Sequence, residues 1–318
     1  MHSFEFSADD LARTRYAVSP VHELVWSTVT LRKPRKAALH APWREAVLAK
    51  LDPRRFELLF ALTSGRTYLP DFLHPAPTRQ RPGLRDQLST VAATDEALAV
   101  AQVRRIATEP APPLREFLAR PRAGLDRLVD MMDDYFTAAL APHWPRIRGI
   151  AEADIAHRAN LTSAHGAAAT INDLHSRLSW NGTILDIHIG SSDEPVRNIR
   201  DAVLVPCCFA WPTVHPSTAA DPDITIAYPP RGVGRLWQSS TARRTDATAD
   251  LLGTTRTAVL RLLEAAHTTG EVAQALGLSA ATASHHLVVL RNAGLAAADR
   301  DGRAVRYSRT PLGDTLTG

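Results

Sequence analysis

Residues 268–291 read TTGEVAQALGLSAATASHHLVVLR, and this stretch decides the fold. Glu271 stands three residues after Thr268, which is the spacing of a capping box at the start of a helix. Gly277 is the residue type best able to adopt the left-handed conformation that ends a helix. Ser279 then caps a second helix, and the apolar stripe of that helix is Ala283, Leu287 and Leu290. Two short helices joined by a glycine-containing turn predict a helix-turn-helix.

The residues after this motif predict a wing. Asp301-Gly302 is a pair favoured in two-residue hairpin turns. Val305 and Tyr307 alternate with small and polar residues, which indicates a strand after the turn. Arg300 and Arg303 flank the expected tip, where arginine can meet phosphate or the minor groove of DNA. In such a domain the second helix enters the major groove.

The stretch 269–295 closely resembles the ArsR-like (arsenic-repressor type) winged-helix family, most specifically in Ser284-His-His-Leu287 and in Leu290-Arg-Asn-Ala-Gly-Leu295. The resemblance covers roughly residues 250–311. The region before it is similar to a long amino-terminal extension found in some actinobacterial members. The phrases that match are Ser19-Pro-Val-His-Glu23, Ala41-Pro-Trp43 and the ten residues from Tyr228 to Trp237.

The resemblance implies a bacterial homodimer that binds a double-stranded DNA operator and usually represses transcription. Ala280 and Ala281 stand where many members have a groove-reading polar residue or proline, so direct base readout is expected to be sparse. Carried over by position, the residues at or near DNA are Ser279, Thr282, Ser284, His285, Arg291, Arg300, Arg303 and Arg306.

The metal sites common in the family have no counterpart in this sequence. Many metal sensors carry a Cys-x-Cys in the helix-turn-helix, which is absent here. Others use Asp and His ligands on a carboxy-terminal helix, whereas only Thr310-Pro-Leu-Gly-Asp-Thr315 and three further residues follow the wing. We therefore expect no metal and no cofactor. We therefore expect any sensing site to lie within residues 1–240.

The chain has 318 residues, of which 45% are hydrophobic and 22% charged, so a packed core and about two domains are expected. The net charge of +4 permits nucleic-acid binding without demonstrating it. No secretory signal, no apolar stretch of membrane-spanning length and no disulfide framework is visible in the sequence. We expect a cytoplasmic protein without membrane contact.

The expected fold class is α+β and mainly helical. A regulatory and dimerisation region over 1–240 combines helices over about 8–178 with a small central mixed sheet over about 184–228. A winged helix-turn-helix over 241–318 follows. Within the first region, Ser19-Pro20 predicts one helix start, and a long helix from about 145 is expected to be interrupted near Gly166.

Aromatic residues gather around the expected sheet, and a small-molecule effector is among the expected partners. Core packing is one reading of these residues, and an aromatic-lined effector pocket is the other. The residues of this hypothesis are Trp180, Phe209, Trp211, Tyr228 and Trp237.

The adjacent cysteines Cys207 and Cys208 leave two alternatives open. They are either buried packing residues or a soft-metal or redox sensor, and the first is favoured because neighbours on a strand face opposite ways. The scattered histidines and Asp186 are attributed to chance. No nucleophile elbow and no phosphate-binding glycine loop occurs, so we do not expect an enzyme. The alternatives to a regulator are an enzyme, or a protein-interaction module, that carries a winged helix as an appendage.

Overall fold

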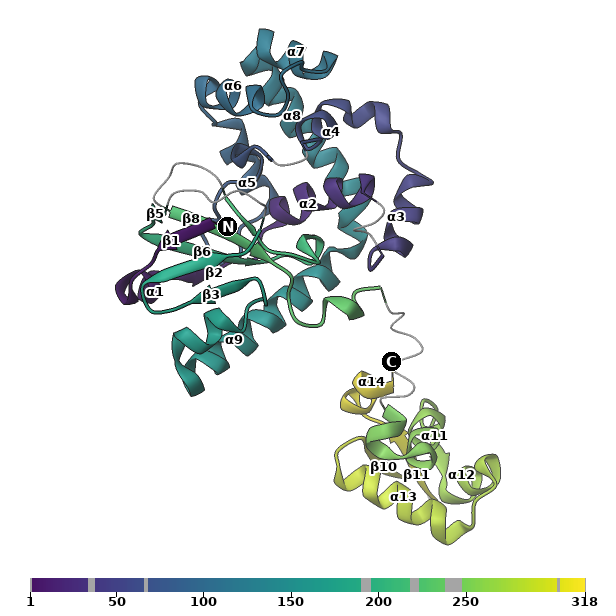
Figure 1. The fold of residues 1–318 in the computed structure, drawn as a ribbon. Coiled ribbons are helices and arrows are strands. Elements are labelled where there is room, and N and C mark those ends of the chain that lie inside the picture. The colour runs from purple at the N-terminus through teal and green to yellow at the C-terminus, as the bar shows by residue number, and fades with distance from the viewer. Residues whose placement is uncertain are drawn as a thin grey trace. The chain divides into compact units, whose positions relative to one another are not determined.

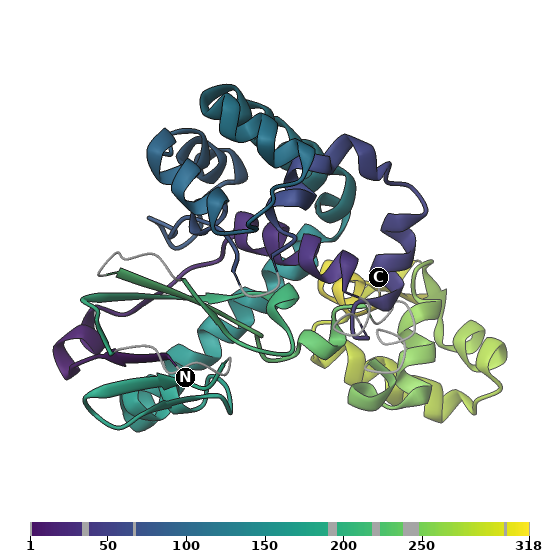
Figure 2. The ribbon, with the colours of Figure 1, turned by 45° about the horizontal axis from the view of Figure 1, so that its top comes forward.

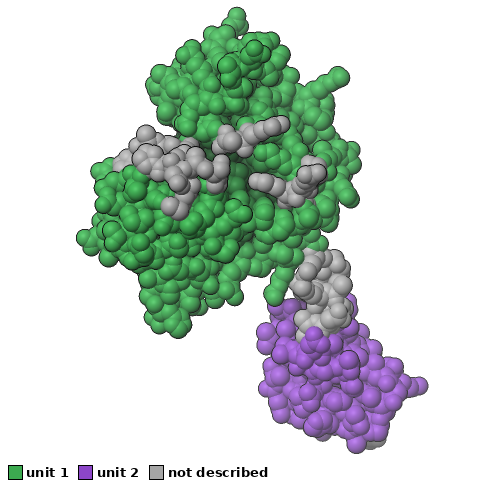
Figure 3. Space-filling model, viewed as in Figure 1, with its two compact units in different colours: residues 1–237 green, residues 238–318 purple. Residues whose placement is uncertain are grey.

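The chain divides into two compact units, Met1–Trp237 and Gln238–Gly318 (Figure 3). The computed structural model describes residues 2–33, 38–65, 68–189, 196–217, 223–237, 248–301 and 304–317. The mainly helical α+β class expected from the sequence is confirmed. None of the described helices is long and apolar enough to cross a membrane.

Helices make up most of the first unit (Figure 1). The α-helices are α1 (Ala8–Arg13), α2 (Pro20–Arg32), α3 (Ala41–Leu48), α4 (Glu57–Leu62), α5 (Leu84–Ala92), α6 (Glu96–Arg104), α7 (Pro112–Ala119), α8 (Pro121–Tyr135) and α9 (Trp144–Asn172). The shorter turns are η2 (Pro53–Phe56), η3 (Asp71–Leu73), the π-helical η4 (Phe136–Leu140), η5 (Ala141–His143), η6 (Cys208–Ala210) and η7 (Val233–Arg235).

Two four-stranded sheets stand where one small mixed sheet was expected. The first has the strand order β3-β4-β1-β5, formed by β3 (Leu178–Trp180), β4 (Ile184–Ile187), β1 (His2–Glu5) and β5 (Arg197–Asn198). The second has the order β2-β6-β8-β7, formed by β2 (Arg15–Tyr16), β6 (Asp201–Pro206), β8 (Asp223–Tyr228) and β7 (His215–Pro216).

The expectation of helix throughout residues 8–178, with the sheet confined to later residues, was therefore wrong at the amino terminus. β2 lies inside that range and pairs in parallel with β6, Arg15 opposite Val203. β1 pairs antiparallel with β4, His2 opposite Ile187. Both strands are short, and their partners lie far along the chain, so tertiary pairing rather than local periodicity determines them.

Each face of the β6–β8 sheet packs against a different layer. Val203 and Val205 of β6 belong to a core shared with helices α2 to α8. Ala202 and Leu204 point the other way, as alternation along a strand requires, into a second core with Phe4 of β1. The second core therefore lies between the two sheets, which are seen one over the other in Figure 2.

Several helix boundaries follow local signals in the sequence. Ser19 caps α2 by accepting a hydrogen bond from the His22 amide, and Pro20 occupies the first helical position. Gly166 interrupts α9 with φ +82°, a left-handed value that glycine adopts most readily. The predicted start at Ser19 and the predicted interruption at Gly166 are both confirmed.

The second unit has its own core and its own three-stranded sheet, β10-β11-β9. Its helices are α11 (Thr254–Leu262), α12 (Thr269–Leu276), α13 (Ala280–Asn292) and α14 (Pro311–Thr317), and a helical segment covers residues 248–252. Its strands are β9 (His267–Thr268), β10 (Ala296–Asp301) and β11 (Ala304–Arg309). The core side chains come from α11, α12, α13 and the hairpin β10–β11.

Candidate nucleic-acid interface

The start of α12 is fixed by a capping box, as the sequence predicted. The Thr268 hydroxyl accepts a hydrogen bond from the Glu271 amide at 3.3 Å, and the Glu271 carboxylate accepts one from the Thr268 amide at 2.7 Å. The hydrogen bond from the Thr268 amide lowers the pKa of the Glu271 carboxyl, and Arg306 lowers it further. The helix ends at Gly277, whose φ of +62° lies in the left-handed region.

Helix α13 follows its N-cap Ser279 and presents two different faces. Ala283, Leu287 and Leu290 are buried in the core of the second unit. Thr282, Ser284, His285 and Arg291 are exposed, with the exposed Ala281 beside them. A helix with one packed stripe and one polar solvent face, held by a turn behind α12, has the form of a recognition helix.

Ser279 and Thr282 are partly occupied in holding the start of α13. The Ser279 hydroxyl accepts a hydrogen bond from the Thr282 amide at 3.1 Å and lies 2.8 Å from the Thr282 hydroxyl. This cap leaves the amides of the first turn pointing out of the helix, where an anion is favoured. Ser279 and Thr282 therefore position the start of the helix. Ser284, His285 and Arg291 take no part in this cap.

The wing is a hairpin, with one correction to its predicted turn. β10 and β11 pair from Ala296 opposite Arg309 to Asp301 opposite Ala304. Asp301 is therefore the last strand residue and not part of the turn, because pairing extends one residue further than the Asp-Gly signal suggested. The two residues between the strands, Gly302 and Arg303, lie outside the described residues.

The two described wing arginines differ in their surroundings. Arg300 is exposed on β10. Arg306 lies on β11 and is only partly exposed, because its guanidinium donates to the carbonyl of Ala266 at 3.2 Å and pairs with Glu271 at 3.5 Å. Arg306 therefore ties the wing to the start of α12. Its sequence-based role was a DNA contact, and the Glu271 pairing was not foreseen.

The comparison with known families agrees with this geometry. A family model described as a helix-turn-helix domain matches residues 254–297, which run from α11 into β10. No curated protein and no solved structure matches the chain. The second unit thus contains a helix-turn-helix domain, a class that binds DNA in transcriptional regulators.

Four of the five aromatic residues proposed to line one effector pocket are divided between the two cores of the first unit. Phe209 and Trp237 belong to the helical core, with ring centroids 6.3 Å apart. Tyr228 and Trp180 belong to the core between the sheets, where the Trp180 indole donates to the Phe6 carbonyl at 2.9 Å. Trp211 is half-buried. The five do not form one cluster, because the β6–β8 sheet separates its two faces.

Cys207 and Cys208 are both buried, as the packing interpretation predicted. They do not alternate on a strand, however, since β6 ends at Pro206 and Cys208 begins η6. Cys207 donates to the carboxylate of Glu23 at 3.3 Å, and that carboxylate also accepts from the amides of Cys208 and Phe209 at 2.7 and 3.1 Å. Burial raises the pKa of both thiols, so neither is an activated thiolate.

Glu23 is a structural residue that sequence reasoning did not single out. Its side chain is buried, and burial raises the pKa of its carboxyl to about 7. An acidic residue directly before the apolar pair Leu24-Val25 of α2 was the available signal. Among the described residues, no group of three or more His, Cys, Asp or Glu side chains is arranged to hold a metal ion.

Proposed function

We propose that the chain is a sequence-specific transcriptional repressor of the ArsR-like kind, active as a homodimer and responsive to a small ligand. The observation that supports this most is α13, which carries an exposed polar face on a capped helix directly after the Gly277 turn. Ser284, His285 and Arg291 read or approach the major groove, and Arg300 of the wing approaches phosphate.

The dimer is supported by apolar side chains that the second unit leaves in solvent. Leu251 is 72% exposed and Leu312 is 56% exposed. Thr248 donates to the carbonyl of Leu316 at 2.8 Å, so the segment 248–252 lies beside α14. If the two leucines belong to one apolar patch, that patch favours association over exposure to water. A second copy related by twofold symmetry would bury both.

Regulation rather than catalysis is proposed for the first unit. The buried ionisable groups between α9 and β8 are engaged with one another: Asp154 pairs with Arg158 and accepts from the Tyr228 hydroxyl at 2.7 Å. Glu23 is engaged with backbone amides. Groups held in this way stabilise the fold.

Binding of the full chain to fluorescent DNA from upstream of its own gene tests the proposal. We expect the anisotropy titration to give an affinity at least about a thousandfold above that for shuffled DNA of equal composition, as specific regulators do. Equal affinity for the two DNAs would contradict the proposal. Repression is tested separately, by a reporter under the same upstream DNA with and without the chain.

A further inference from the structure

Two basic side chains of the second unit, one on α11 and one on α13, have buried polar atoms without a hydrogen-bond partner. Arg256 lies in the first turn of α11, and His286 lies midway along α13. The two helices share the core that contains Leu260 and Leu287. The Nε atom of Arg256 and the Nδ1 atom of His286 are both buried, and neither has a partner among the described residues. Because an unpartnered buried polar atom is unfavourable, the pair points to an acceptor supplied from outside the chain.

The guanidinium of Arg256 is half-buried and held at the start of α11. Its Nη1 atom donates to the carbonyl of Leu252 at 3.4 Å, and no carboxylate of the described residues forms an ion pair with it. The N-cap of α11 is Gly253, which has no side chain to accept from the amides of the first helical turn. The uncapped helix start and the guanidinium both favour an anion at this end of α11.

His286 extends this basic site onto the flank of α13. Its half-buried ring lies 5.8 Å from the ring of the exposed His285, centroid to centroid. Desolvation lowers the pKa of His286, and the charges of Arg256 from α11 and His285 from α13 lower it further, so the ring is mainly neutral at pH 7 in the free protein. Since consecutive residues are about 100° apart around a helix, His286 lies beside the face that His285 presents to solvent. The basic site therefore borders the helix proposed to enter the major groove.

We propose that Arg256 and His286 form a phosphate clamp, in which both side chains hold one backbone phosphate of the DNA that α13 reads. The phosphate oxygens would accept from Nε of Arg256 and from Nδ1 of protonated His286, which gives both buried atoms a partner. The negative charge of the phosphate favours the imidazolium, so DNA binding takes up a proton at His286. The choice of DNA as partner rests on the proposed function. A backbone contact of this kind fixes the orientation of the domain and carries no sequence information.

Anisotropy titrations of the full chain on upstream and shuffled DNA, at several salt concentrations, test the clamp. Arg256→Gln should weaken binding to both DNAs by a similar factor, about tenfold, and reduce the slope of log affinity against log salt by about one. His286→Gln should weaken both DNAs in the same way. The double variant should also lose about one in slope and not two, because both side chains hold the same phosphate. Arg261→Gln is the matched control, since it removes an exposed arginine about 140° further round α11, and it should leave the slope unchanged.

Two further readouts separate a phosphate contact from a merely structural role. As the pH falls from about 8 to about 6, the affinity of the unaltered chain should rise more than that of His286→Gln, because only the unaltered chain takes up the proton at position 286. Arg256→Lys keeps the positive charge and should recover most of the salt slope that Arg256→Gln loses. Hydrogen exchange of the α13 amides establishes that the second unit of each variant is folded.

An unchanged salt slope in Arg256→Gln, a slope lowered by about two in the double variant, or equal pH profiles for His286→Gln and the unaltered chain would overturn the clamp. Saturable binding of inorganic phosphate at millimolar concentration without DNA would instead indicate a site for free anions, and would also overturn it. Preference for upstream DNA with unchanged slopes would remove the clamp and leave the regulator. Equal affinity for the two DNAs, with slopes that still depend on Arg256, would remove the sequence-specific regulator and leave the clamp.

Discussion

Single residues of the first unit connect segments that are far apart in the sequence. The Glu23 carboxylate on α2 holds the amides of Cys208 and Phe209, and Trp43 and Trp237 pack against the ring of Phe209. The three phrases that resemble the family's amino-terminal extension thus meet around Phe209.

The buried Glu23 predicts how the stability of the first unit depends on pH. Its pKa is raised from 4.5 to about 7 by burial, so the folded protein binds the proton more tightly than the unfolded chain. Its contribution to the free energy of unfolding is complete below about pH 4.5 and is lost as the pH rises through about 7. Buried His22 has a lowered pKa and acts in the opposite direction, so a difference measurement is needed.

The difference between the unaltered chain and Glu23→Gln isolates this effect. Urea unfolding followed by tryptophan fluorescence reports the first unit, which holds every tryptophan. We expect the stability advantage of the unaltered chain over Glu23→Gln to decrease steadily from pH 5 to pH 7.5. Parallel pH profiles for the two proteins would show that Glu23 does not titrate in this range.

Residues of α13 and of the wing are expected to affect DNA binding in different ways. His285→Ala should weaken binding to upstream DNA by about 1–3 kcal/mol and weaken binding to shuffled DNA much less, because a base contact carries sequence information. Arg300→Ala should weaken both and reduce the slope of log affinity against log salt by about one. These values come from anisotropy titrations at several salt concentrations.

His165→Ala is the matched control, since it removes an exposed histidine of α9 in the other unit. It should change neither the affinity nor the salt slope. If His285→Ala behaved like His165→Ala, α13 would not be the reading helix.

At the scale of elements, local sequence signals were sufficient to predict the start or end of a helix wherever a capping residue determines it. Ser19, Thr268, Gly277 and Ser279 act through neighbours within a few residues, and all four were read from the sequence. β1 and β2 could not be predicted in this way, because their partners are nearly two hundred residues away. The Asp301-Gly302 signal predicted a hairpin correctly but placed Asp301 in the turn. The turn preference of a residue pair does not show how far the pairing of the flanking strands extends.

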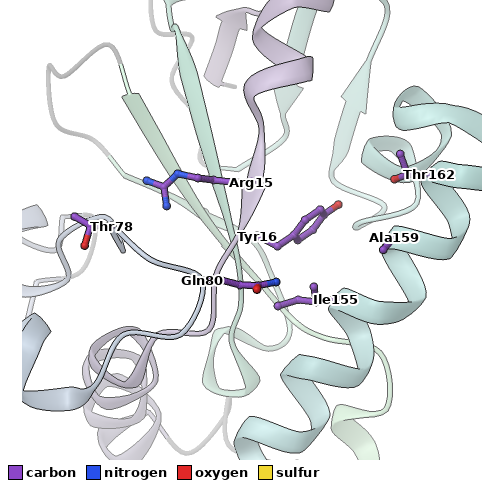
Figure 4. Close-up of a pocket in the computed structure, with 7 residues that line it drawn as sticks. All are labelled: Arg15, Tyr16, Thr78, Gln80, Ile155, Ala159 and Thr162. Carbon is purple, nitrogen blue, oxygen red and sulfur yellow. The ribbon is translucent and has the colours of Figure 1, made fainter.

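The features of the candidate site likewise separate into those that local sequence predicts and those that only tertiary contacts determine. The capped α13 and its exposed residues follow from helical periodicity, and the structure agrees with them. The pairing of Arg306 with Glu271, the Glu23 cluster and the open groove beside Arg15 (Figure 4) all depend on tertiary contacts. The aromatic residues do not form the single cluster that was hypothesised, because no local pattern shows which face of the β6–β8 sheet each ring will occupy.

Gly270 lies within α12 and Gly277 lies at its end, and substitution by alanine is expected to have opposite effects at the two positions. Gly277 has φ +62°, so Gly277→Ala should destabilise the second unit by roughly 1–2 kcal/mol, although nothing crowds the new Cβ. Gly270 lies within α12 with ordinary φ and open space around it, so Gly270→Ala should be neutral or slightly stabilising. Hydrogen exchange of α12 and α13 amides in the full chain measures both.

A destabilised Gly270→Ala, or an unaffected Gly277→Ala, would contradict the conformation that separates α12 from α13. The glycine pair is a matched comparison because each variant adds the same methyl group.

At the scale of the whole molecule, the proposed homodimer predicts a mass in solution of twice the 34.7 kDa chain. Leu251→Ser and Leu312→Ser together should shift sedimentation toward the monomer, because the polar side chains reduce the apolar area that association can bury. Leu98→Ser is the matched control, since Leu98 is a 50% exposed leucine on α6 of the first unit. Equal dimer formation in both variants would place the dimer contact elsewhere.

Hydroxyl-radical footprinting of the full chain on DNA upstream of its own gene tests the central claim most directly. A dimeric winged-helix repressor should protect two half-sites whose centres lie about one helical turn apart, roughly 10–10.5 base pairs, and lose that pattern with His285→Ala. Protection spread evenly along the DNA, or a footprint that His285→Ala leaves unchanged, would contradict the claim that α13 reads an operator.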